Sequence, residues 1–318
     1  MDNSKLCDAH CHPHDDVEHL DMIPKLKTGH ITIMGVRQDD WDRVAEVTAQ
    51  CASGRCIPSF GIHPWFLHRL MVDDNADPKT HYDQVLTAKI ASEKQEMIEA
   101  LERPFPREEW VANLKQRLAD HPQAVVGEVG LDRAARLLPD GAIEWHGVKP
   151  TTVQTSIDHQ MHVLRIQLEI AREFQRAVSV HCVQASGHLL QLLQELAVPS
   201  KKKDKSSSTA LPPPVRLCIH SFVGSAGSIP QFLNVKGFSI YVSFSVAISG
   251  RLAKSKLQQL MCAIPEDRLL IESDLNSPQG QDEAMEEIVK VVAEARQWSI
   301  EQTIEQTYRN WQTFVGMQ

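Results

Sequence analysis

Residues that bind divalent metals well stand at the downstream ends of separate short apolar runs in this sequence. Runs such as AVVG, AVSV and VRLCI are each followed directly by a glutamate or a histidine. The six residues placed in this way are His10, His12, Glu128, His181, His220 and Asp274. In a parallel barrel the carboxyl ends of all strands meet at one rim, so side chains at those ends converge. The placement therefore predicts a barrel whose rim binds two metal ions and catalyses a hydrolysis.

Eight apolar, β-branched runs are spaced along the chain, which is the strand count of a (β/α)8 barrel. They lie at about 5–9, 30–36, 57–61, 124–129, 177–181, 215–220, 238–244 and 268–272. Most are followed by segments with helical periodicity, for example 158–174 and 281–298. In the first of these segments, Met161, Leu164 and Leu168 fall close to one helix face. Strands that alternate with helices pair in parallel through right-handed crossovers, so we expect an α/β fold, a (β/α)8 barrel.

Three segments are longer than barrel connections require. Residues 66–120 and 133–157 are interpreted as insertions, the second of them at the catalytic rim. Residues 200–214 have low complexity and are expected to be flexible. The lysines at 201–205 are expected to lie in a solvated loop, with a phosphate-binding patch or a localisation signal as the alternatives. Because no repeat or convincing boundary is found, we expect residues 1–318 to form a single barrel domain.

Composition and charge restrict the partners of the chain. The 318 residues are 42% hydrophobic and 23% charged, as is ordinary for a soluble globular protein. No apolar run approaches the roughly 20 residues that cross a bilayer, and the first ten residues lack the pattern of a secretory signal. A net charge of −8 argues against a wide duplex-binding interface, although metals could neutralise a phosphate locally. We expect no membrane partner and a cytoplasmic location, with nuclear entry left open.

The seven cysteines are an odd number and are widely scattered, so reduced thiols are expected rather than a disulfide framework. Cys51 and Cys56 are five positions apart and lack a partner pair at zinc-finger spacing, and we interpret them as core or surface thiols. Cys11 lies between His10 and His12. On a strand its side chain points away from theirs, which makes it a poor ligand candidate.

Each candidate ligand has a structural alternative. On a strand His10 and His12 point to the same side, and two imidazoles can hold Zn, Mn or Fe, although short His-rich stretches often have no function. Glu128, in VVGEVGLD, can bridge two cations through its two oxygens, and a buried salt bridge to an arginine is its alternative. A lone histidine after a strand is usually a core residue, but His181 and His220 occupy equivalent positions on adjacent predicted strands.

Carboxylates at two further strand ends are candidates for metal binding, catalysis or substrate binding. Asp274 ends the last apolar run, where it could hold a metal and accept a proton from the attacking water. Asp132 is expected to support the metal site or to bind substrate, with structural capping as the alternative.

The motifs that contain these residues resemble the successive signatures of the TatD family, metal-dependent deoxyribonucleases of the amidohydrolase superfamily. The matching phrases are DAHCH, GIHPW, GEVGLD, QMHVLRIQLEIA followed by VSVHC, CIHSFVGS and AIPEDRLLIESD. The match runs from the first strand to NWQTF near the end of the sequence, apart from the long loops. The resemblance implies a (β/α)8 barrel with a two-metal site that cleaves the ends of DNA.

The resemblance also assigns roles to the metal-binding residues. His10 and His12 would hold the first metal, and Glu128 would bridge it to the second. Asp274 would bind the first metal and act as the general base. The remaining ligands of the second metal would be His181 and His220.

Substrate contacts are implied by the same resemblance. His63, in GIHP, matches a family histidine near the substrate pocket, where it could contact phosphate or stabilise the turn before Pro64. Ser221 belongs to the family's loop after the sixth strand, where backbone groups can approach substrate. The other matching residues of that loop are Phe222 and Gly224.

The chain departs from the family pattern at two positions. Relatives commonly carry an arginine two residues after the fifth-strand histidine, a natural phosphate ligand, whereas this chain has Val183. Arg133 and Arg136 are the candidates to replace it. The family's spacing from the last carboxylate to a proline is two residues, whereas here Pro278 lies four residues after Asp274.

Three functions follow as hypotheses. The first is a metal-dependent hydrolase of ester bonds, a deoxyribonuclease that uses two Mg, Mn or Zn ions on DNA ends or single strands. The second keeps the metals and hydrolyses a carboxyl ester or an amide. The third is a scaffold that binds a protein partner through its enlarged loops, because these resemble a fungal branch with members named only as interaction partners. The sequence does not indicate an oligomeric state.

Overall fold

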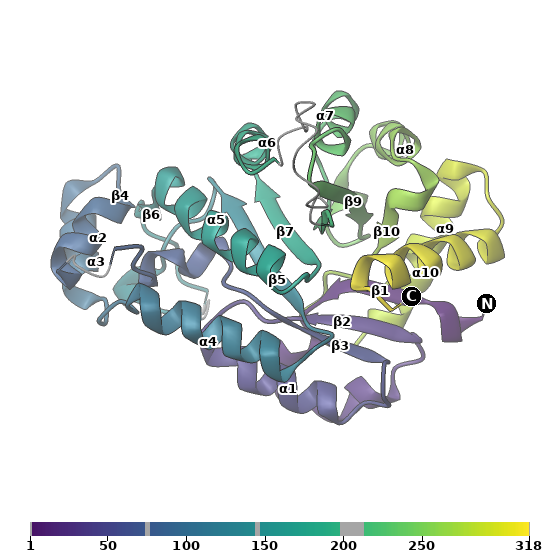
Figure 1. The fold of residues 1–318 in the computed structure, drawn as a ribbon, viewed down its shortest axis with the longest axis horizontal. Helices are drawn as coiled ribbons and strands as arrows, with labels where there is room; N and C mark the ends of the chain where they lie inside the picture. Colours follow the sequence, from purple (N-terminus) through teal and green to yellow (C-terminus); the bar gives the residue numbers. More distant parts are fainter. Residues whose placement is uncertain (1, 74–76, 144–146, 198–212, 318) are drawn as a thin grey trace, which may run out of the picture.

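Eight strands form one parallel sheet that curls into a nearly closed barrel in the computed structural model of the chain (Figure 1). The structure describes residues 2–73, 77–143, 147–197 and 213–317. In sheet order the strands are β1 (Cys7–Cys11), β2 (His30–Met34), β3 (Cys56–Phe60), β5 (Val125–Asp132), β7 (Val178–Val183), β8 (Val215–Ile219), β9 (Phe238–Phe244) and β10 (Leu269–Ile271). Each strand overlaps one predicted apolar run, and the predicted (β/α)8 barrel is confirmed.

The first and last strands meet where the predicted ligands lie. The backbone N–H of Asp274 donates to the carbonyl of His10 at 3.0 Å, and the N–H of His12 donates to the carbonyl of Leu275 at 2.8 Å. The two ends of the sheet are therefore joined at the rim that carries the carboxyl ends of the strands.

Helices cover the outside of the barrel (Figure 1). They are α1 (Trp41–Ala49), α4 (Arg107–Asp120), α5 (Ile157–Glu173), α6 (Ser186–Glu195), α7 (Ile229–Leu233), α8 (Lys254–Ala263), α9 (Gln281–Arg296) and α10 (Ile300–Val315). The predicted helices at 158–174 and 281–298 are α5 and α9. Leu164 and Leu168 of α5 are buried, as the periodicity predicted, and Met161 is half-buried.

Short 3-10 helices make up many of the remaining connections. They are η1 (Asn3–Lys5), η2 (Pro13–Asp15), η3 (Leu20–Lys25), η4 (Gln38–Asp40), η5 (Pro64–Arg69), η6 (Pro139–Gly141), η7 (Ala226–Ser228), η8 (Ser249–Arg251) and η9 (Glu266–Arg268). Of these, η5 follows β3 at the rim and leads into the first insertion.

The C-terminal helix α10 has strong end signals and closes one side of the barrel. The hydroxyl of Ser299 accepts from the N–H of Gln302 at 3.1 Å, and the Gln302 side chain accepts from the N–H of Ser299 at 2.8 Å, which is a complete capping box. Trp311 of this helix is buried among strand residues, and its indole N–H donates to the hydroxyl of Thr32 in β2 at 3.0 Å.

The two predicted insertions pack together at one end of the molecule, at the left of Figure 1. The first contains α2 (Pro78–Val85), β4 (Leu86–Thr87) and α3 (Ala91–Ala100), and the second contains β6 (Gln154–Thr155). Strands β4 and β6 pair in an antiparallel ribbon. A small apolar cluster lies beneath the ribbon and consists of Tyr82, Val85, Leu86, Met97, Leu137 and Val153. Both insertions therefore contribute strands and apolar side chains to one shared unit.

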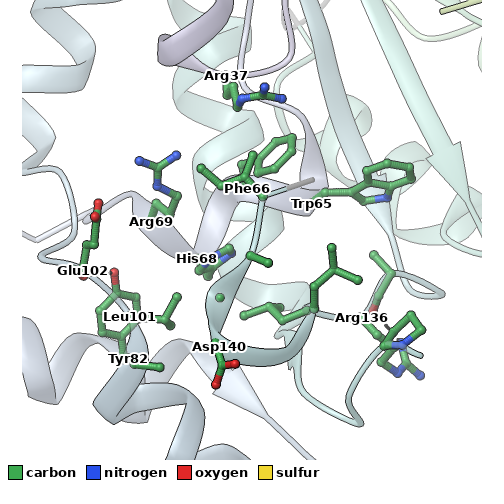
Figure 2. A pocket seen from close by; sticks show the side chains of 18 of the residues that line it. Arg37, Trp65, Phe66, His68, Arg69, Tyr82, Leu101, Glu102, Arg136 and Asp140 are labelled. Atoms are coloured by element: carbon green, nitrogen blue, oxygen red, sulfur yellow. Dashed lines mark hydrogen bonds between the residues drawn. The ribbon is translucent and has the colours of Figure 1, made fainter. Parts of the chain in front are cut away.

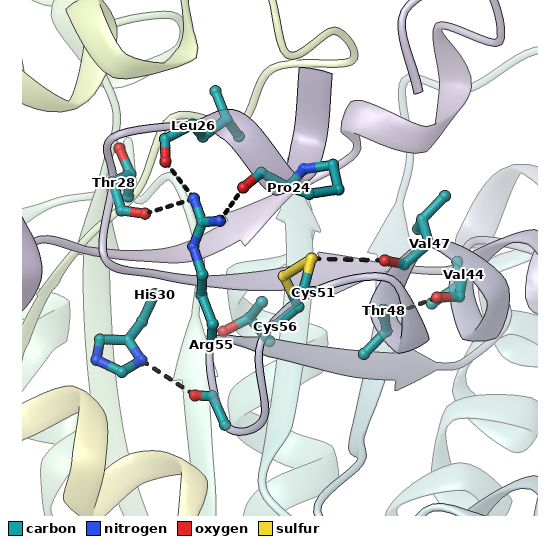
Figure 3. Close-up of a disulfide and its surroundings, with 12 residues drawn as sticks. Pro24, Leu26, Thr28, His30, Val44, Val47, Thr48, Cys51, Arg55 and Cys56 are labelled. Atoms are coloured by element: carbon teal, nitrogen blue, oxygen red, sulfur yellow. Dashed lines mark hydrogen bonds between the residues drawn. A yellow bond between two sulfur atoms is a disulfide. The ribbon is translucent and has the colours of Figure 1, made fainter. Parts of the chain in front are cut away.

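Cys51 and Cys56 form a disulfide, so their interpretation as free thiols was wrong (Figure 3). Cys51 follows α1 and Cys56 begins β3, and the chain reverses direction between them. The reversal brings their Cα atoms to 6.0 Å, within the range of disulfides, and the number of intervening residues alone does not reveal this. The free cysteines among the described residues are Cys7, Cys11, Cys182, Cys218 and Cys262.

The loop closed by the disulfide anchors a neighbouring segment. The guanidinium of Arg55 donates to the backbone carbonyls of Pro24 and Leu26 and, at 3.3 Å, to that of Thr28 (Figure 3). Cys11 is buried, and its thiol contacts the carbonyl of Thr32 at 3.4 Å rather than the imidazoles beside it.

Two further expectations concern the low-complexity segment and the possibility of a membrane-spanning helix. Most of the low-complexity segment 200–214, including the lysines at 201–205, lies outside the described residues. Within the described ranges, no helix has both the length and the apolar character that a membrane span requires.

Candidate metal centre

The fold brings the six predicted metal ligands together at the carboxyl-end rim of the barrel. His10, Glu128 and His181 lie within β1, β5 and β7, and His220 directly follows β8. Strands β7 and β8 are neighbours in the sheet, as predicted for the histidines at their ends. His12 lies one residue after the end of β1, and Asp274 lies three residues after the end of β10.

The carboxylate of Glu128 lies at the middle of this group. One oxygen, Oε2, is 3.3 Å from Nε2 of His10 and 3.1 Å from Nε2 of His12. The other, Oε1, is 3.0 Å from Nδ1 of His181 and 2.9 Å from Nε2 of His220. The two oxygens therefore face two separate pairs of imidazoles. Among the described residues the ion-pair partners of Glu128 are histidines, which excludes the alternative of a buried salt bridge to an arginine.

His63 lies closer to the centre than a substrate contact alone requires. Its Nε2 is 3.2 Å from Oε1 of Glu128, on the side of His181. Nitrogen and oxygen atoms of His63, Glu128 and His181 could share one ion, as could those of His10, His12 and Glu128. A third such group combines both sides of the centre and consists of His10, His220 and Asp274. The structure thus adds a histidine to the donors that the sequence predicted for the second ion.

Asp274 stands at the open edge of the centre. Its Oδ1 lies 3.8 Å from Nε2 of His10 and 3.9 Å from Nε2 of His12, and its side chain is 13% exposed. The hydroxyl oxygen of Ser221 lies 3.0 Å from its Oδ2. Asp274 and Ser221 both adopt left-handed backbone conformations, with φ of 56° and 41°. Non-glycine residues rarely adopt this conformation, and it is held in place here by the surrounding structure.

Hydrogen bonds on the far ring nitrogens orient the first two histidines. Nδ1 of His10 lies 2.8 Å from the hydroxyl of Ser179, and Nδ1 of His12 lies 3.0 Å from the carbonyl of Met34. A carbonyl can only accept, so Nδ1 of His12 carries a proton, and Nε2 is the nitrogen that a metal could bind once its own proton is displaced. The neutral ring that remains is the tautomer that a metal ligand needs.

Sequence reasoning missed a buried carboxylate beneath the centre, Glu272. Its Oε1 accepts from the backbone N–H of Ser221 at 2.8 Å and from the Ser221 hydroxyl at 2.6 Å. The same oxygen lies 3.4 Å from Nδ1 of His220, and Oε2 accepts from the hydroxyl of Ser243. Alternation along the last run could have found it, because Glu272 lies two residues before Asp274 in an otherwise apolar strand end.

Asp132 joins the centre to a pocket beside it. Its Oδ2 lies 3.2 Å from Nε2 of His181 and accepts from the indole N–H of Trp65 at 3.0 Å. Its Oδ1 accepts from the backbone N–H groups of Ala134 and Ala135 at 2.7 and 2.9 Å. Asp132 therefore caps the following turn and contacts a proposed metal ligand, and its role in metal or substrate binding stays a prediction.

The other predicted substrate contacts occupy different environments. Ser221 is buried, and its hydroxyl lies between Glu272 and Asp274, so it supports these carboxylates. Arg133 is exposed, and its backbone N–H donates to the carbonyl of Val183. Arg136 donates from its guanidinium to two backbone carbonyls. Contacts of these residues with substrate stay predictions.

In the centre, the carboxylate of Glu128 lies among neutral and protonated imidazoles. Burial opposes ionisation of Glu128, but the histidines around it hold its pKa well below the ordinary value. Burial also opposes protonation of His12, yet its hydrogen bond to Glu128 raises its pKa to about 9. Burial lowers the pKa of His63 to about 4. A cation that binds here would displace protons from the imidazoles, as metals generally do at histidine sites.

The fold and the donor cluster define a metal-dependent hydrolase of the barrel class. The family model described as TatD related DNase matches residues 7–316, and the chain belongs to this family. A similar protein is the Cut9-interacting protein scn1 of Schizosaccharomyces pombe, which is 35% identical over 98% of both chains. An uncharacterized deoxyribonuclease of Saccharomyces cerevisiae is 27% identical over 98% of this chain and 99% of its own.

Solved structures show the same fold. The TatD homologue YJJV from Escherichia coli aligns with a TM-score of 0.62 and 19% identity over 98% of each chain. A TatD family hydrolase from Entamoeba histolytica aligns with a TM-score of 0.62 and 14% identity over 97% of each chain.

Proposed function

We propose that this chain is a two-metal phosphodiesterase that cleaves DNA at ends or in single strands. The observation that carries the proposal is the position of Glu128, whose two oxygens face separate pairs of histidines. A carboxylate in this position can bridge two ions. Membership of a family described as DNases, and similarity to a yeast protein named as a deoxyribonuclease, support DNA as the substrate.

The donor set fits two divalent ions. The first ion would be held by Glu128 together with His10, His12 and Asp274. The second ion would be held by Glu128 together with His63, His181 and His220. Imidazole with carboxylate suits Zn or Mn, and carboxylates also accept Mg. Divalent ions in this position would supply an activated water and neutralise charge on the phosphoryl oxygens.

The residues of the chain would have distinct roles in the reaction. Asp274 would accept the proton of the attacking water, because it is the partly exposed carboxylate beside the first pair of histidines. Ser221 would hold one of its oxygens, and Glu272 would hold Ser221 and His220 in place. Asp132 would orient His181 toward the centre.

Substitution of the proposed base tests these roles. Asp274→Asn should reduce cleavage of a labelled single-stranded oligonucleotide about 100- to 10,000-fold, the usual contribution of a general base, while thermal unfolding still shows a folded protein. Chelation should abolish cleavage, and added Mn or Zn should restore it. Asp158→Asn, the same change at an exposed site on α5, should leave the rate unchanged. Full activity of Asp274→Asn would refute the assigned role.

A carboxyl ester or amide is the second candidate substrate. Val183 at the end of β7 favours it, because it stands where relatives commonly carry a phosphate-binding arginine. A panel of phosphodiester and carboxyl-ester substrates distinguishes the two, since preference for the ester would displace the nuclease proposal.

A protein partner is the third candidate. It is favoured by the similarity to a protein named for its interaction with Cut9, and by exposed apolar side chains on the insertions, Ile90 and Val148. A scaffold has no need of bound metal. A purified chain without tightly bound metal, and without a rise in melting temperature when metal is added, would favour this candidate over an enzyme.

A further inference from the structure

A pocket of about 890 Å³ lies beside the metal centre, between η5 and the second insertion (Figure 2). Asp132 and Trp65 border it on the side of the centre, and Leu101, Leu137 and Asp140 of the insertion unit are among its other walls. Its volume falls within the range of small-molecule sites, about 300–1,000 Å³. The pocket depends on the insertions, because they supply most of its lining.

Arg37 is positioned to bind an anion at the edge of this pocket that is nearest the centre. The backbone carbonyls of the three residues before it hold residues of the metal centre. The carbonyl of Met34 accepts from Nδ1 of His12. The carbonyls of Gly35 and Val36 accept from the backbone N–H groups of Glu128 and His63, respectively. Arg37 is the next residue along the chain, so it emerges at the same rim.

The guanidinium of Arg37 has no competing partner among the described residues. Within the part of the chain that the structure describes, its Nε is buried without a hydrogen bond and no carboxylate pairs with it. Its guanidinium carbon lies 5.4 Å from the centre of the Phe66 ring. The other two arginines of the pocket are engaged. Arg69 pairs with Asp39 at 2.8 Å, and Arg136 donates to backbone carbonyls. Among the arginines that line the pocket, Arg37 is therefore the one available to bind phosphate, the role of the arginine that relatives carry in place of Val183.

The walls of the pocket suit a flat heteroaromatic group. Trp65 lines the pocket and is 55% exposed, and its indole N–H donates to Asp132, so the pocket is bordered by an accessible aromatic ring of fixed orientation. Figure 2 shows Trp65 and Phe66 side by side along one wall. His68 also lines the pocket, and its Nδ1 is buried without a hydrogen-bond partner among the described residues. A ligand with a flat ring would stack on the exposed indole of Trp65, whereas the buried Nδ1 of His68 is not accessible to it.

Carboxylates line the pocket at both ends, but those near the centre, Asp39 and Asp132, already accept from Arg69 and Trp65. The carboxylates of Glu102 and Asp140 are exposed and line the part formed by the insertions, and Figure 2 places Asp140 on the opposite side from Arg37. A nucleic-acid strand that continued through the pocket would bring a second phosphate against these anions. A single nucleoside has no charge to repel there.

We propose that this pocket binds one terminal nucleotide of the substrate, with Arg37 on the phosphate and the base stacked on Trp65. The inference rests on the proposed phosphodiesterase function and narrows it to substrates that present a free nucleotide end. The insertions thereby determine the specificity for substrate ends, because they form walls around the terminal nucleotide that a barrel rim without insertions would lack.

Calorimetric titration of thymidine 5′-monophosphate into the chelator-treated full chain tests the pocket without activity. Arg37→Gln should weaken binding of the monophosphate at least tenfold, since charge-assisted hydrogen bonds to phosphate are lost, and should leave the weaker binding of thymidine unchanged. Ala142→Trp, which fills the pocket from an exposed position, should weaken both. Arg251→Gln, at an exposed arginine outside the pocket, is the matched control and should bind as the unmodified chain does.

Two chromogenic diesters separate this inference from the proposed function. Bis(p-nitrophenyl) phosphate needs only the metal centre, whereas the p-nitrophenyl ester of thymidine 5′-monophosphate also offers a nucleoside to the pocket. With added Mn, the nucleoside ester should have the lower KM. Ala142→Trp should remove that advantage, whereas Arg37→Gln, which acts on the phosphate that both diesters carry, should raise the KM of both. Cleavage of both diesters with equal KM, or no effect of either variant on monophosphate binding, would overturn the pocket proposal alone. Failure to cleave either diester would overturn the phosphodiesterase function.

Discussion

Glu128 shows how one residue organises the candidate site. Its carboxylate is buried, and this would be costly without partners, yet histidines face both of its oxygens. The sequence predicted the bridging position but left a salt bridge to an arginine open, because periodicity does not reveal the neighbours of a strand end. The barrel topology excludes the arginine by bringing the ends of β1, β7 and β8 to this carboxylate, and the bridging of two metals stays a prediction.

His159 provides a residue-scale prediction about pH. It is buried on α5, its Nε2 contacts the carbonyl of Leu67 at 2.9 Å, and burial lowers its pKa to about 4. The unfolded chain binds this proton at a higher pH, near 6.5, so the stabilisation is present above that pH and is lost as the pH falls toward 4. Between pH 7.5 and 5 this amounts to about 2 kcal/mol in the free energy of unfolding.

Urea unfolding of His159→Gln measures this contribution. Glutamine can still donate to the carbonyl of Leu67 but does not titrate, so the variant should lose about 2 kcal/mol less than the unmodified chain over the same pH interval. Both proteins are treated with chelator, and exposed His162→Gln on the same helix is the control. Parallel stability curves for His159→Gln and the unmodified chain would show that His159 does not contribute.

At the scale of elements, the strands were the most predictable part. Each is a short apolar run, and the helices between them carry a clear periodicity, so local pattern and final fold agree. The pairing of β4 with β6 was not predictable, because both strands have two residues and lie in segments 67 positions apart. The role of Glu272 depends on the same long-range geometry, since its partners come from the loop after β8 and from β9.

The disulfide between Cys51 and Cys56 gives a prediction for the connection between α1 and β3. Closing a loop of about six residues should stabilise the fold by about 2 kcal/mol through the entropy of the unfolded chain. The double substitution Cys51→Ser and Cys56→Ser should lower the free energy of unfolding by this amount. Dithiothreitol should lower the stability of the unmodified chain similarly and leave the double variant unaffected. An unmodified chain that is insensitive to dithiothreitol would count against the bond.

At the scale of the whole molecule, the barrel and its insertions have separate tasks. The barrel gathers six predicted ligands that lie up to 264 positions apart, from His10 to Asp274. The insertions pack on each other and form the walls of a pocket beside that centre. Sequence alone predicted where the insertions occur but not that they form one unit, because their contact depends on tertiary packing around a small apolar cluster.

The central claim is that this rim holds two cations on opposite oxygens of Glu128. Anomalous X-ray diffraction from crystals grown with Zn tests it most directly. We predict two peaks, each about 2.0–2.2 Å from a different oxygen of Glu128, one beside His10 and His12 and the other beside His181 and His220. A single peak, or peaks that do not contact Glu128, would contradict the account.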